Sequence, residues 1–224
     1  MLAAVADNAR WCDLVCRSHG LPTALGEDLW VAPEGAPRFY PDAVTLAPGM
    51  TAEAVLGGIA ARPGSAVKDS FADVDLGSHG FAVLFEARWL FREPAPYRDR
   101  PRLGWDAVAT EDEFDRWVTA ADLEGILRPE LLGDATVRLL LARGEGPEAA
   151  GAVVHATDGV AGLSNVFAAG MDPDAVWPDL PAVVRQAAGD LPIVGYEHGD
   201  ELRCALATGF AAIGALRVWV RLPA

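Results

Sequence analysis

The C-terminal end of the chain constrains its fold more than any other segment. Residues 191–197 are a short apolar run with β-branched side chains, and residues 216–221 alternate apolar with charged ones, so both predict strands. Between them, Asp200 is placed to cap a helix over residues 201–208. The pair Gly209-Phe210 follows, where a left-handed helix end favours glycine and the aromatic ring is expected to turn inward. The segment therefore predicts a strand, a helix and a returning antiparallel strand.

The composition is that of a folded globular protein. The chain has 224 residues, of which 51% are hydrophobic and 22% charged, enough to bury a substantial core. No apolar run approaches the ~20 residues of a membrane span. Residues 1–10 lack the basic segment and apolar core of a secretory signal. We therefore expect a soluble, cytoplasmic protein.

The formal net charge of -14 limits the partners that the chain can bind. A field of this sign repels phosphate backbones and anionic lipid, so we expect neither nucleic acid nor membrane as a partner. It would favour cationic or amine substrates, although acidic surfaces also simply keep proteins in solution. Lys68 is the only lysine among 18 basic residues, a bias typical of GC-rich coding sequences such as those of actinobacteria.

Cysteine usage argues against a disulfide framework. The odd set Cys12, Cys16 and Cys204 stands in a chain without a secretory signal. Cys12 and Cys16 lie four residues apart on a predicted helix, and His19 alone would not complete a metal site. We expect packing cysteines and no metal.

Two folded units are predicted, over residues 1–95 and 103–224, joined by a linker at residues 94–101 that contains three prolines. In the first unit, helices are expected over residues 4–18 and 51–61, and strands over 29–31, 43–46, 65–72 and 81–91.

The second unit is predicted to be a mixed, mostly antiparallel sheet with flanking helices, an α/β or α+β fold. Thr110 and Glu113 form a capping box for a helix ending near residue 121, and Asp158-Gly159 is a hairpin signal. Strands are expected over residues 105–108, 136–142, 151–157 and 160–167, and a helix over 173–188 with a kink at Pro178 or Pro181.

This element order, together with Gly209-Phe210, resembles the Gcn5-related N-acetyltransferase (GNAT) superfamily over the C-terminal half. The resemblance implies transfer of an acyl group from acetyl-CoA, or another acyl-CoA, to an amine on a small molecule or peptide. The N-terminal half repeats part of the pattern, since Gly80-Phe81 also precedes an Arg- and Trp-containing strand. Either the halves are tandem related units, or two amphipathic strands share a common pattern.

In the resembled family, acyl-CoA lies in a wedge between two parallel strands, here those beginning near Val160 and Ile193. The loop after the first strand turns its N–H groups toward the pyrophosphate. The cofactor-binding residues implied are Asn165, Val166, Phe167, Ala168, Ala169 and Gly170. The family's glycine-rich loop pattern is missing, because Gly170 is its only glycine. Asp172 and Asp174 put carboxylates in the loop, where they are also ordinary helix caps.

The family's usual acid, a tyrosine four residues before the Gly-Phe pair, is replaced by Ala205. Tyr196, Glu197 and His198 are the remaining candidate catalytic residues, and Glu197 or His198 could take the proton of an amine. Polar residues before a helix also serve as caps. The leading hypothesis is an N-acyltransferase, and the alternative is a degenerate, non-catalytic module that binds a small ligand or a partner protein. The acceptor, the acyl chain length and the oligomeric state, a homodimer included, stay open.

Several further polar and aromatic residues have two interpretations. Asn165, beside Ser164 in an apolar strand, marks either a strand bulge or a ligand contact. His155 is expected to be a core or surface residue. Tryptophans on predicted strands could line a pocket or simply pack the core; they are Trp30, Trp89, Trp105 and Trp219.

Overall fold

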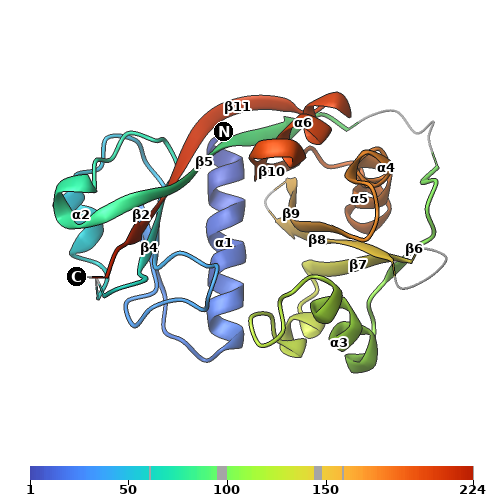
Figure 1. Cartoon of the computed structure of the whole chain (residues 1–224), viewed down its shortest axis with the longest axis horizontal. Helices are drawn as coiled ribbons and strands as arrows, with labels where there is room; N and C mark the ends of the chain where they lie inside the picture. The colour runs from blue at the N-terminus through green and yellow to red at the C-terminus, as the bar shows by residue number, and fades with distance from the viewer. Residues whose placement is uncertain (61, 95–99, 144–147, 158, 224) are drawn as a thin grey trace. The chain divides into compact units, whose positions relative to one another are not determined.

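The computed structural model describes residues 1–60, 62–94, 100–143, 148–157 and 159–223. Its contacts group the chain into two compact units, residues 1–89 with 213–224, and residues 90–212. Strands β5 (Phe81–Arg92) and β11 (Ala211–Arg221) each run from one unit into the other (Figure 1).

The end of β11 thus groups with the N-terminal residues, whereas the predicted boundaries, 1–95 and 103–224, assign it to the second domain. Those boundaries concern domains that fold independently, and they remain a prediction. The predicted linker falls mostly on residues 95–99, which lie outside the described part of the chain.

The first unit is a mixed sheet with two helices and a short 3-10 turn. Its strands follow the order β1-β2-β3-β4-β11-β5. The β3–β4 pair is parallel, and the β1–β2, β2–β3 and β4–β11 pairs are antiparallel. Besides β5 and β11, its elements are α1 (Leu2–Ser18), β1 (Ala24–Leu25), β2 (Leu29–Val31), β3 (Ala43–Thr45), α2 (Ala52–Leu56), β4 (Ala66–Asp69) and η1 (Gly77–His79).

Helix α2 starts as predicted but is shorter. The side chain of Thr51 caps it by accepting a hydrogen bond from the Ala54 N–H at 3.2 Å. The helix ends at Leu56, because the pair Gly57-Gly58 follows and glycine is a weak helix former. The predicted end, Ala61, lies outside the described residues.

Buried aromatic and thiol side chains form part of the first unit's core. Helix α1 places Cys12 and Cys16 against Trp30 and Val44, and both thiols are buried and unoxidised. Burial raises the pKa of each thiol, so both stay protonated and act as packing residues, as predicted. Of the four strand tryptophans, Trp30, Trp89 and Trp219 are buried and Trp105 is half-buried. Core packing is therefore the interpretation that the buried three support.

The second unit confirms the predicted mixed, mostly antiparallel sheet. Its strand order is β10-β9-β8-β7-β6. Among the described residues of these strands, the β10–β9 pair is parallel and the other three pairs are antiparallel. The elements are β6 (Trp105–Ala107), α3 (Glu111–Ala120), η2 (Pro129–Gly133), β7 (Val137–Arg143), β8 (Ala149–Thr157), β9 (Val160–Ala169), α4 (Pro173–Val176), α5 (Leu180–Ala188), β10 (Ile193–Glu197) and α6 (Gly199–Ala207).

Local signals within this unit are largely confirmed. The capping box of Thr110 and Glu113 is present at the start of α3. Strands β8 and β9 pair up to Thr157 and Val160, as the Asp158-Gly159 hairpin signal requires, although Asp158 itself lies outside the described residues. His155 is buried in β8, which places it in the core.

The predicted helix 173–188 is broken into α4 and α5, which confirms an interruption at the prolines. Pro181 stands in the first turn of α5, where its missing N–H costs nothing. Asp179, just before α5, is buried, and its carboxylate accepts hydrogen bonds from the N–H groups of Arg102 and Leu103, both at 2.8 Å. It also accepts from the Trp105 Nε1 at 3.1 Å. These bonds tie the break to the segment before β6.

At the C-terminal helix one prediction is wrong and two are confirmed. Helix α6 begins after His198, and Asp200 lies inside its first turn instead of capping it. Gly209 has a φ of 88°, as a left-handed helix end requires. Phe210 is buried in the unit's core, where its ring lies edge-on to Trp177 at 5.9 Å between centroids. No helix in the described ranges has the length and apolar character needed to cross a membrane.

Candidate functional site

Strands β9 and β10 pair over only part of their length. The parallel register joins Ile193 to Ala161 and Val194 to Gly162 and ends there. Gly195 still lies close to β9, since a Cβ atom at this position would stand 2.6 Å from the carbonyl oxygen of Leu163. Beyond that point the remaining residues of both strands are half-exposed. The two strands are therefore not joined along their whole length, as the predicted wedge requires.

A bulge in β9 lies at Asn165 and Val166, beyond the last parallel pair at Gly162. The β8–β9 register shifts between Gly151 and Val153, so that Asn165 and Val166 oppose a single residue of β8. Asn165 has a φ of 49°, in the left-handed region that asparagine tolerates. Its Oδ1 accepts a hydrogen bond from the Ser164 hydroxyl at 3.2 Å. Bulges bend and twist a strand, so the end of β9 beyond Asn165 need not run parallel to β10.

The residues implied as cofactor-binding follow this bulge in order. Asn165, Val166, Phe167, Ala168 and Ala169 end β9, and Gly170 is the first residue of the next loop, with a φ of 73°.

Of these residues, Phe167 has its side chain committed to packing. Its ring lies edge-on to Trp117 at 5.2 Å between centroids, and Gly151 leaves room for it. The main chain of this segment, more than its side chains, is what could contact a ligand.

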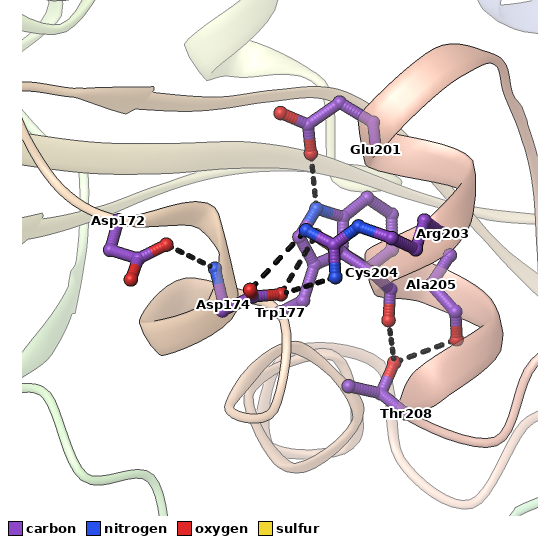
Figure 2. Close-up of polar contacts among 8 residues, drawn as sticks. All are labelled: Asp172, Asp174, Trp177, Glu201, Arg203, Cys204, Ala205 and Thr208. Atoms are coloured by element: carbon purple, nitrogen blue, oxygen red, sulfur yellow. Dashed lines mark hydrogen bonds and ion pairs between the residues drawn. The ribbon is translucent and has the colours of Figure 1, made fainter.

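The loop after β9 leads into α4, where two carboxylates are held by the protein itself (Figure 2). Asp172 caps α4, accepting the Asp174 N–H at 2.9 Å. Asp174 forms an ion pair with Arg203 of α6, with N–O distances of 3.0 and 3.3 Å. The Cys204 thiol donates to the same carboxylate at 3.2 Å. The hydrogen bonds from Arg203 and Cys204 lower the pKa of Asp174, so it stays ionised.

These residues fit one part of acyl-CoA and not the other. The end of β9, with no parallel partner register from β10, offers extended main chain of the kind that pairs with the amides of a pantetheine arm. The loop does not suit a pyrophosphate. An N–H at the start of α4 is already taken by Asp172, and two carboxylates stand where an anion would have to approach.

Glu197 is the candidate catalytic residue with a strongly perturbed environment. It ends β10 and is half-buried. Burial, followed by the negative charge of Glu201, raises its pKa to about 8, although the His198 backbone N–H acts in the opposite direction. Of the other two candidates, Tyr196 is half-buried like Glu197, whereas His198 is exposed at the start of α6.

Sequence reasoning missed the residues that surround Glu197 and the loop. The Trp177 indole, which is buried, donates a hydrogen bond to the Glu201 carboxylate (Figure 2). Glu201 follows Glu197 by four residues. This spacing of two acids at the start of a helix could have indicated, from the sequence alone, that their charges interact. Arg203 is 29 positions from Asp174, so no local pattern links them.

The position of the family's usual acid is structural here. Ala205 is fully buried in the core of the second unit. Its carbonyl oxygen accepts the Thr208 hydroxyl at 2.8 Å and the Phe210 N–H at 3.2 Å, which closes the end of α6. Any proton transfer at this site must therefore use another group.

Comparison with known proteins gives a likeness in structure alone. No protein-family model matches the chain, and neither does any curated protein sequence. Among solved structures, a GCN5-related N-acetyltransferase from Kribbella flavida matches with a TM-score of 0.67 and 18% identity, covering 99% of this chain and 96% of that one. A GNAT-family protein from Novosphingobium aromaticivorans matches with a TM-score of 0.57 and 17% identity, covering 95% and 96%.

A functionally unknown conserved protein from Staphylococcus epidermidis matches with a TM-score of 0.61 and 9% identity, over 91% of this chain and 95% of that one. These matches extend beyond the C-terminal half on which the sequence resemblance rests. The chain therefore has the fold of the Gcn5-related N-acetyltransferases.

Proposed function

We propose that the protein is an N-acyltransferase that moves an acyl group from a thioester donor to an amine. The observation that supports the proposal is that three features occur together at the ends of β9 and β10. The parallel register ends after Val194, β9 bulges at Asn165, and a carboxyl group with a pKa of about 8 stands at Glu197. The fold shared with GNAT proteins supports an acyltransferase-type activity.

The proposed donor is acyl-CoA, acetyl-CoA in the simplest case, bound through its thioester arm. The main chain of Asn165 to Gly170 would hold this arm along the end of β9. When bound, the thioester supplies an activated acyl group. The proposed acceptor is an amine on a small molecule or peptide, and a net charge of -14 would favour a cationic one.

Glu197 would act as the general base. An amine attacks only when it is unprotonated, so a carboxylate must take its proton, directly or through one water. A pKa of about 8 makes this carboxylate a stronger base than an ordinary glutamate. As the C–N bond forms and the C–S bond breaks, one proton moves from the attacking amine to the Glu197 carboxylate, and the sulfur leaves as a thiolate, which takes a proton from the Glu197 carboxyl group or from water.

Thiol release tests the proposal. The full chain is mixed with acetyl-CoA and a panel of primary amines, and free thiol and amide product are both measured. The proposal predicts amine-dependent thiol release that falls about a hundredfold or more in Glu197→Gln. Glu124→Gln, an exposed glutamate of the same unit, is the matched control and should keep full activity.

A non-catalytic module is the second candidate, and Ala205 in place of the family's tyrosine favours it. In that case a donor or amine would raise the melting temperature of the protein, and no amine would produce thiol. If Glu197→Gln releases thiol as fast as the unaltered chain in the presence of an amine, the protein is a transferase but Glu197 is not its general base.

A further inference from the structure

We infer that this site recognises the thioester arm of its donor, and that Asp172 and Asp174 keep the diphosphate of a nucleotide from adding to the binding affinity. The inference rests on the proposed function. It concerns which donors the site accepts: acyl thioesters of pantetheine should serve as well as acyl-CoA.

Asp172 already accepts an N–H at the start of α4 that a phosphate could otherwise bind. Its carboxylate accepts the Asp174 N–H at 2.9 Å, so a phosphate oxygen could reach that N–H only by displacing the protein's own cap. Helix α4 spans only Pro173–Val176, and its first residue has no N–H to offer because it is proline. The helix start is thus satisfied internally.

Asp174 forms an ion pair with Arg203, so this cation is not available to an incoming anion. The two terminal guanidinium nitrogens of Arg203, Nη1 and Nη2, donate to its carboxylate (Figure 2), and the Cys204 thiol adds a third hydrogen bond. Burial and the bond to Asp174 raise the pKa of Cys204 to about 11, so the thiol keeps the proton that it donates. With two carboxylates and one guanidinium, the loop carries a net negative charge toward any anion.

The end of β9 has no such feature. Asn165 to Ala169 are uncharged, half-exposed residues of a strand whose main chain can pair with amide groups. The uncharged pantetheine arm, which carries amides and the thioester, suits this segment. Recognition therefore lies with the part of the donor that all pantetheine thioesters share.

Two donors distinguish this inference from the proposed function. S-acetylpantetheine and acetyl-CoA are titrated into the full chain by calorimetry, and both are assayed for thiol release. The inference predicts dissociation constants within about threefold of each other. Acetyl-CoA binding more than about tenfold tighter overturns the inference and leaves the transferase intact. If neither donor binds or reacts, the proposed function fails and the inference fails with it.

A second experiment removes the charge of Asp172. Asp172→Ser keeps a good helix cap without the charge, and it should tighten acetyl-CoA binding about fivefold and leave S-acetylpantetheine unchanged. Asp112→Asn, in the first turn of α3, removes a matched exposed charge and should change neither constant. Added salt should also tighten acetyl-CoA binding to the unaltered chain, because it screens like charges. If neither Asp172→Ser nor added salt changes the dissociation constant of acetyl-CoA, the inference is contradicted.

Discussion

In the proposed mechanism, Glu197 is the base and Glu201 is the neighbouring charge that acts on it. Removing one charge should change the basicity of the other, because part of the raised pKa of Glu197 comes from Glu201. If Glu197 is the base, the transfer activity of the unaltered chain should rise as the pH rises through about 8, where Glu197 loses its proton. In Glu201→Gln the midpoint of kcat/KM should move to lower pH, since the repulsion is gone. A midpoint that stays near its original value contradicts this account; Glu124→Gln is the control.

The raised pKa of Glu197 also predicts how the stability of the folded state depends on pH. The folded-state pKa of Glu197 is about 8 against an ordinary value of 4.5, so its proton stabilises the folded state. That contribution is fully present below pH 4.5 and is lost as the pH rises through about 8. Urea unfolding at several pH values should therefore show a smaller loss of stability across this window in Glu197→Gln. Parallel curves for the two proteins contradict the assignment.

At the scale of elements, the β8–β9 bulge depends on Gly151. A Cβ atom there would lie 2.3 Å from the Phe167 ring and 2.7 Å from the Trp117 indole nitrogen. Gly151→Ala should lower the free energy of unfolding by about 1–3 kcal/mol through overpacking, measured by urea denaturation. Gly104→Ala is the matched control, because nothing lies within 4 Å of its Cβ position. Equal stability of the two variants contradicts this packing.

The sequence predicts elements well where the signal is local. Thr110 and Glu113 meet within one helical turn, and Gly209 adopts the conformation for which glycine is favoured, so both are readable without a structure. Asp200 shows the limit, since the helix already begins after His198, two positions earlier, and the Leu202 N–H donates to the His198 carbonyl oxygen. The Asp174–Arg203 pair shows another, because it depends on how α4 packs against α6.

At the scale of the whole molecule, the net charge of -14 predicts that the proposed transferase prefers cationic acceptors. A diamine should show a lower KM than a monoamine that carries a carboxylate, and added salt should narrow the difference by screening the field. Steady-state kinetics at low and high ionic strength would measure both. A salt-independent preference would mean that short-range contacts, and not the overall charge, choose the acceptor.

The proposed function requires that the donor binds along the end of β9. This can be measured by amide hydrogen exchange of the full chain, with and without saturating S-acetylpantetheine. Exchange should slow over residues 164–170 and change little in β6 and β7. Unchanged exchange over 164–170 in the presence of bound donor would contradict this requirement.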